Sequence, residues 1–185
     1  MDVLEAVLTR RSATRLVPPA PDDAALLELI QAASAAPDHG LLRPWRLVLV
    51  RDAQRELLGA ALAEAATDAA AAERARAKPL RAPLLVSIVF CPRPDHPKVP
   101  VWEQLAATVS VVQNLHLLLH SRGWGAIWRT GRAVDAPAVR HCVGVGAGEQ
   151  LLGWLYVGTP GSGPGGAPRS GFDARTKVRT LGAAA

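Results

Sequence analysis

Two arginines and a serine, Arg10, Arg11 and Ser12, directly follow a short segment in which apolar residues recur at helical spacing. The helix should end near residues 9–11, so these side chains come at a corner of the chain. Guanidinium groups form paired hydrogen bonds with phosphate oxygens, and a serine hydroxyl adds another donor. The corner is therefore a candidate phosphate site, although an ordinary solvated turn has the same composition.

Further polar segments lie between apolar parts of the chain, and each of them alone is also consistent with a solvated turn. The first two are “PDH” with “RPW”, over residues 37–45, and “WRTG”, over residues 128–131. Basic residues gather again near the end of the chain, at Arg169, Arg175, Lys177 and Arg179. Only their order along the chain makes the set informative.

The common hydrolase, zinc-peptidase and phosphate-loop motifs are absent from the sequence. His116 and His120 stand four residues apart, but no Glu or Cys lies near them and their segment is apolar. We therefore interpret both as core residues and predict no metal site. Cys91 and Cys142 belong to no CxxC pair, so we expect two buried thiols and no disulfide.

The net charge of +5 comes mainly from arginines that are spread along the chain. Without a block of like charges or interleaved aromatic residues, we expect no nucleic-acid binding. The most apolar long segment, 105–119, contains five polar residues and is too short to span a bilayer, so we expect no membrane association. The acidic start is unlike a secretory leader, and we expect a cytoplasmic protein.

Hydrophobic periodicity and capping residues predict an α+β fold with a sheet of about four strands packed on helices. Helices are expected over residues 2–11, 22–33, 53–77, 101–122 and 135–144, and strands over 46–50, 82–90, 124–128 and 151–158. The 101–122 helix is apolar nearly all round and should be central and buried. The pattern leaves antiparallel and mixed sheets open. Residues 1–160 should form one domain, and 161–185 an irregular tail rich in glycine and proline.

Six segments, taken in order, resemble the flavin-dependent nitroreductase family, most closely its small single-domain bacterial branch. They are “RRSATRL”, “APDHGLLRPWRLVLV”, “RAPLLVSIVF”, “KVPVWEQ”, “GWGAIWRTG” and “LLGWLYVGTP”. The resemblance covers roughly residues 1–160. It implies an intertwined homodimer, a non-covalent FMN at each of two subunit interfaces, and ping-pong reduction of nitroaromatic, quinone or similar acceptors by NAD(P)H.

The resemblance also implies roles for individual residues. Arg10, Arg11 and Ser12 would hold the FMN phosphate and ribityl chain. Ala35 and His39 would reach the same flavin from the other subunit. The first subunit would line the flavin with Trp128, Arg129, Thr130 and Gly131. No catalytic side chain is expected, because the cofactor carries the hydride chemistry.

Arg43, Trp102 and two C-terminal arginines leave alternatives open. Leu41 and Arg43 stand where many family members have Asn and Gln, so Arg43 either brings a charge to the flavin or substrate, or points to solvent. Trp102 is a candidate substrate-binding lid residue, with core packing as the alternative. Arg169 and Arg175 are both candidates to assist the phosphate.

Two rival functions remain at this stage. The first is a flavin-binding protein of the same fold that acts on another substrate or on flavin itself. The second is a non-enzymatic basic module that binds a nucleotide or a polyanion.

Overall fold

The computed structural model describes residues 1–161 and 171–182. Its helices are α1 (Val3–Thr9), α2 (Asp23–Ala33), α3 (Asp52–Glu64), α4 (Ala69–Arg76), α5 (Val101–Ser121) and α6 (Pro137–Val143). Its strands are β1 (Leu16–Val17), β2 (Trp45–Arg51), β3 (Leu84–Phe90), β4 (Gly125–Arg129) and β5 (Gln150–Pro160). Short 3₁₀ turns cover His39–Leu41, Pro79–Arg81, Arg132–Asp135 and Ala174–Lys177.

The named strands form one antiparallel sheet with the order β1-β5-β3-β2, and β4 also pairs with β5. The α+β prediction is confirmed, and all four predicted strands are present. The two-residue strand β1 was not predicted. It lies just before three prolines, and it pairs with the end of β5 through Leu16 opposite Pro160.

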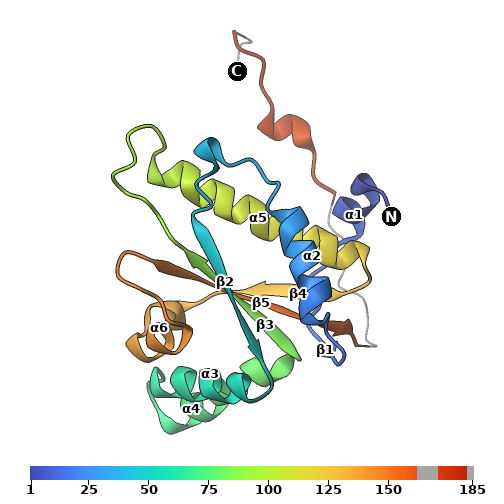
Figure 1. The fold of residues 1–185 in the computed structure, drawn as a ribbon. Helices are drawn as coiled ribbons and strands as arrows, with labels where there is room; N and C mark the ends of the chain where they lie inside the picture. The colour runs from blue at the N-terminus through green and yellow to red at the C-terminus, as the bar shows by residue number, and fades with distance from the viewer. Residues whose placement is uncertain (162–170, 183–185) are drawn as a thin grey trace.

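Helices cover both faces of the sheet, with α5 and α2 on one side and α3, α4 and α6 on the other (Figure 1). Strand β3 therefore has no polar face, and all its residues are buried. Leu84, Val86 and Ile88 pack on the α2–α5 side, whereas Leu85 and Val89 pack on the α3–α6 side. Burial on both faces explains why this strand is apolar except for Ser87, which is buried as well.

Helix α5 is the long central helix that the sequence predicts, but only one of its faces is buried in the single chain. Val101, Trp102 and Val109 are exposed on its other face. The buried side chain of Gln104 accepts a hydrogen bond from the Arg93 amide at 2.8 Å. Gln104 also donates to the carbonyls of Arg93 and Val99, both at 2.9 Å. It thereby fixes the proline-rich loop before α5.

The alanine-rich segment 53–77 does not form the single helix that we predicted. Helix α3 ends at Glu64, and Asp68 begins α4 by accepting a hydrogen bond from the Ala71 amide at 2.8 Å. The two helices then pack so closely that a Cβ on Gly59 would lie 2.5 Å from the Arg76 carbonyl oxygen. Alanine carries no information about such a break, because it favours helix on either side of it.

The other helix boundaries depend on their first residues. Asp2 caps α1 as predicted, and Asp22, one of two adjacent candidates, caps α2; each accepts a backbone hydrogen bond at 2.8 Å. Asp135 does not cap α6 as we predicted. It lies in a 3₁₀ turn, and α6 begins with Pro137 after Ala136. Proline at the first helical position has no backbone N–H that needs an acceptor, and its fixed φ suits the first turn, so the helix starts there.

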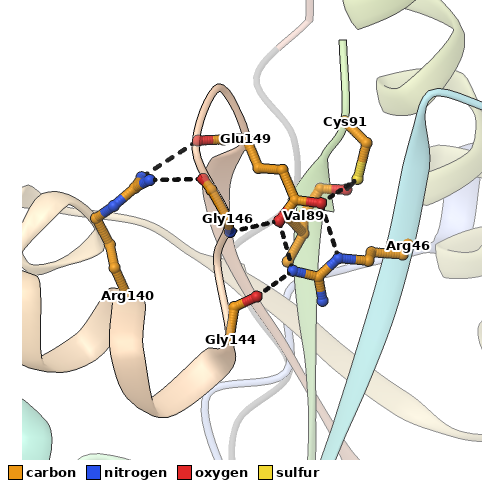
Figure 2. Close-up of polar contacts among 7 residues, drawn as sticks. All are labelled: Arg46, Val89, Cys91, Arg140, Gly144, Gly146 and Glu149. Atoms are coloured by element: carbon orange, nitrogen blue, oxygen red, sulfur yellow. Dashed lines mark hydrogen bonds and ion pairs between the residues drawn. The ribbon is translucent and has the colours of Figure 1, made fainter.

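Glu149, just before β5, joins the loop 144–149 to the sheet (Figure 2). Its carboxylate accepts hydrogen bonds from Arg46 at 2.6 and 3.1 Å and from the Gly146 amide at 2.7 Å. The Cys91 thiol donates to the same carboxylate at 3.2 Å, and burial with this contact raises the thiol pKa to about 11. Cys91 is only partly buried and Cys142 is exposed, so the expectation of two buried cysteines was wrong.

This cluster should make the protein sensitive to acid. The hydrogen bonds from Arg46 lower the pKa of Glu149 from 4.5 to about 2. A carboxylate with a depressed pKa in the folded state stabilises the protein above its unfolded pKa, and this contribution is lost as pH falls from about 4.5 towards 2. Glu149→Gln should cost about 1–2 kcal/mol of unfolding free energy at neutral pH and flatten the acid dependence.

Urea unfolding at several pH values measures both effects. The matched control is Glu56→Gln, which changes an exposed acid on α3. The control should lose stability with acid as steeply as the wild type. If Glu149→Gln does so too, the ion pair with Arg46 does not stabilise the fold.

Candidate functional site

The candidate phosphate corner lies where α1 ends and the chain runs beside β4. Arg10 follows the helix as its C-cap, and its amide donates to the Ala6 carbonyl. Ser12 then forms a parallel bridge with Ala126 of β4, and the Ala13 amide donates to the Ala126 carbonyl at 3.0 Å. The predicted end of the first helix thus places Arg10–Ser12 against an edge of the sheet.

A pocket of about 710 Å³ opens at this corner. Its lining residues are Met1, Thr9, Arg10, Arg11, Ser12, Ala13, Thr14, Arg15, His116, His120, Gly123, Trp124, Gly125, Ala126, Pro160 and Gly161. Three arginines and two histidines are among them, and this described lining contains no aspartate or glutamate. Such a charge distribution favours an anionic ligand.

The three predicted residues of the corner are not equivalent. Arg11 turns back on α1, where its guanidinium donates to the carbonyls of Leu8 at 2.6 Å and Arg10 at 3.0 Å. It therefore closes the end of the helix while adding charge to the pocket. Arg10 is partly buried, and Ser12 is exposed. Arg15 lines the same pocket and was not among the predicted residues.

His116 and His120 both line the pocket, and their interpretation as core residues holds for His116 but not for His120. His120 is only partly buried and lies 2.8 Å from the Thr9 hydroxyl, between its Nε2 and Oγ1. His116 is buried, and its Nε2 lies 3.1 Å from the Ala126 carbonyl oxygen. Their spacing of four residues put them on one helix face, which was a usable indication. The sequence alone does not show that this helix face contacts the arginine corner.

Strand β4 leads from the corner to the predicted segment 128–131. The Trp128 indole donates to the Leu152 carbonyl at 3.0 Å, and the Arg129 guanidinium lies 5.5 Å from the centre of the Tyr156 ring. Thr130 and Gly131 are exposed, and Gly131 has φ 134°. The segment lies on the strand that Ser12 contacts, but the Arg129 side chain is turned to Tyr156 and does not line the pocket.

The loop that carries His39 is held in a fixed shape. The Asp38 carboxylate accepts hydrogen bonds from the amides of Leu42 at 3.2 Å and Arg43 at 2.7 Å. Leu41 and Arg43 have φ angles of 51° and 45°, which non-glycine residues rarely adopt. Strained backbone of this kind often marks a functional loop. Leu41 and Arg43 are also the two positions at which the sequence differs from the family pattern.

His39 itself is tied to the beginning of α5. Its Nδ1 lies 2.8 Å from a carboxylate oxygen of Glu103. Trp102, the candidate lid residue, is adjacent and 69% exposed, so core packing does not describe it in the single chain. Glu103 was not predicted as a site residue. Its only indication in the sequence is its place in “KVPVWEQ”.

A single chain does not bring the two predicted halves of the site together. The corner meets α5 at His120, and the His39 loop meets it at Glu103. Seventeen residues of helix separate these two positions, which corresponds to about 25 Å at 1.5 Å per residue. The remaining predicted residues do not join the pocket either. Arg43 is exposed, Arg175 pairs with Asp173 in a 3₁₀ turn, and Arg169 lies outside the described residues.

The comparison with known families gives a direct result. A model described as “Nitroreductase family” matches residues 7–159. The chain belongs to the nitroreductase family. A relative from Escherichia coli K12, named “Putative NAD(P)H nitroreductase YdjA”, is 37% identical over 164 residues, covering 86% of this chain and 89% of the relative.

Solved structures of the nitroreductase family share the fold. A nitroreductase-like family protein from Bacillus cereus superposes with a TM-score of 0.84 at 24% identity, covering 99% of this chain and 97% of the other. A mutant of NfnB, described as an FMN and NADPH-dependent nitroreductase from “sphigopyxis sp. strain HMH”, has a TM-score of 0.79 at 20% identity, covering 98% and 100%.

Over residues 1–161 and 171–182, no helix is both long and apolar enough to cross a membrane. Within the same ranges, no three His, Cys, Asp or Glu side chains gather as a possible metal site.

Proposed function

We propose that the protein is an NAD(P)H-dependent FMN oxidoreductase that reduces nitroaromatic, quinone or similar acceptors. The observation that carries this proposal is the basic pocket beside Arg10 and Ser12, whose described lining has no carboxylate. The name of the Escherichia coli relative supports NAD(P)H as the electron donor. The description of NfnB supports FMN as the cofactor.

The residues present fit an FMN phosphate and ribityl chain. A volume of about 710 Å³ is in the usual range for a cofactor pocket. Arg10 and Ser12 supply donors for the phosphate, and Arg11 adds a positive charge from the end of α1. Residues 128–131 follow from Ala126 along β4, and we assign them to the flavin ring.

Bound FMN supplies the hydride chemistry, and the side chains supply binding and orientation. In the His39 loop, the Nδ1–H group donates to the Glu103 carboxylate, which leaves Nε2 free to contact a ligand. Arg43 belongs to this loop, and Trp102 is next to Glu103 at the beginning of α5. We assign both to the part of the site that binds the electron acceptor. We assign no proton transfer to His39.

A complete site requires two copies of the chain. The corner and the His39 loop lie at opposite ends of α5, so one flavin contacts both only if the loop comes from a second subunit. Apolar surface for such a contact is available, because α1 buries only Ala6. The exposed hydrophobic residues of α1 are Val3, Leu4, Val7 and Leu8.

Visible absorbance of the purified protein separates the rival functions. A flavin spectrum, present on purification or after reconstitution with FMN, is expected for the proposed enzyme and for a flavin protein with another substrate. If no FMN is retained even from excess, the basic-module alternative stands. Turnover of NAD(P)H with a nitroaromatic or quinone acceptor then distinguishes the two flavin-dependent functions.

Removing the Arg10 guanidinium should weaken FMN binding. Arg10→Ala should cost about 1.5–3 kcal/mol, the range for hydrogen bonds to charged groups. Ser12→Ala should cost less, and riboflavin, which has no phosphate, should bind the wild type poorly. Fluorescence titration measures all three, with Arg74→Ala on the exposed surface of α4 as control. Riboflavin binding as tight as that of FMN would exclude a phosphate site.

The protein should sediment at about twice its mass of 19.5 kDa. Leu4→Glu should dissociate the dimer and release FMN together, because a charge on the apolar face of α1 opposes burial. Leu57→Glu changes a similarly exposed leucine on α3 and should leave both unchanged. A monomer that binds FMN stoichiometrically would contradict the shared site.

Steady-state kinetics should follow a ping-pong pattern, because the nicotinamide and the acceptor use the same open face in turn. Double-reciprocal plots at several NAD(P)H concentrations should be parallel. His39→Ala should reduce FMN affinity without abolishing flavin reduction in rapid mixing. A fall of about a hundredfold or more at full flavin occupancy, the scale of general acid–base catalysis, would make His39 a chemical participant.

A further inference from the structure

The protonation state of His120 follows from its contacts. The Thr9 hydroxyl donates its only proton to the Glu5 carbonyl at 2.6 Å. Its contact of 2.8 Å with His120 therefore has the ring Nε2–H as the donor. A second proton on this imidazole can only be added at Nδ1. His120 lines the same pocket as Arg10 and Ser12, so its charge acts on a ligand bound there.

Without a ligand, the surroundings of His120 disfavour its protonated form and lower its pKa. Burial lowers its pKa first, followed by repulsion from Arg10 and Arg11, and only Glu5 acts in the opposite direction. Arg15 adds another cationic side chain to the lining, and the amino-terminal residue Met1 lines the pocket as well. The neighbouring His116 on α5 is buried, and burial lowers its pKa too. The pocket thus holds excess positive charge until an anion enters it.

We propose that His120 is a proton-coupled binding residue for the FMN phosphate, taking up a proton at Nδ1 as the cofactor binds. This inference rests on the flavin function proposed above. His116 differs from His120 in its burial and in its partner. His116 is buried, and its Nε2–H donates to the backbone carbonyl of Ala126. We assign His116 to holding α5 against β4 rather than to binding the anion.

The direction of the pH effect follows from the charges. A phosphate dianion in the pocket stabilises the imidazolium, so the pKa of His120 is higher in the complex than in the free protein. FMN affinity therefore rises as pH falls between these two pKa values, by at most about tenfold per pH unit. The phosphate itself begins to protonate near pH 6, which opposes the effect. The contribution of His120 is therefore separated from that of the phosphate by comparing the wild type with a variant that lacks the imidazole.

The test is a fluorescence titration of FMN with wild type, His120→Gln and His141→Gln at several pH values between about 6 and 8. Glutamine can still donate to Thr9 from its amide, so the contact between α1 and α5 is kept while the titration is removed. His141, on the exposed side of α6, is the matched control. His120→Gln should bind FMN about three- to tenfold more weakly than wild type near pH 6 and almost equally near pH 8. Riboflavin should show no such difference.

A second measurement keeps the proposal testable if His120→Gln does not fold. Nuclear magnetic resonance of the wild-type imidazoles, with and without FMN, should show the pKa of His120 rising on binding. Parallel pH profiles for wild type and a folded His120→Gln, or an unchanged His120 titration with FMN bound, would overturn the coupling while leaving the flavin function intact. Failure of the wild type to bind FMN at any pH would instead overturn the flavin proposal, and this inference with it.

Discussion

One hydrogen bond at each end of α5 connects this helix to the two polar parts of the candidate site. His120 contacts Thr9 at one end, and Glu103 contacts His39 at the other. A helix packed along one face on the sheet cannot shorten or bend to bring these ends together. The separation between the corner and the His39 loop is therefore set by the length of α5. In the proposed dimer, a second copy of the chain would bring its His39 loop to the corner of the first.

The sequence predicted the elements whose hydrophobic pattern is strong. The continuous apolar runs of β3 and β5, the long α5, and the capping residues Asp2 and Asp22 were all identifiable, because burial and capping leave local traces. The break at Asp68 was hidden by alanines that favour helix on both sides. The two residues of β1 are too few for any periodicity, and their pairing partner lies more than a hundred residues away.

The candidate site was predictable only where residue type and chain corner coincided. Arg10–Ser12 could be found because their chemistry is unusual for a helix end. His120 and Glu103 could not, because their roles depend on contacts with segments that are 111 and 64 residues distant. Outside the pocket, several arginines meet carboxylates, as Arg46 does with Glu149, whereas the described pocket lining has none. The net charge of the chain alone does not show which arginines have carboxylate partners and which line the pocket.

Because α1 buries little surface against the rest of the chain, its stability depends on its neighbours. A helix of seven residues is unstable by itself, and this one buries only Ala6. Its order therefore depends on what lies beside it, including whatever anion occupies the pocket. A ligand that binds only the ordered arrangement stabilises it in proportion to the logarithm of its free concentration. If the corner binds FMN as proposed, the thermal stability of the protein depends partly on the free concentration of that cofactor.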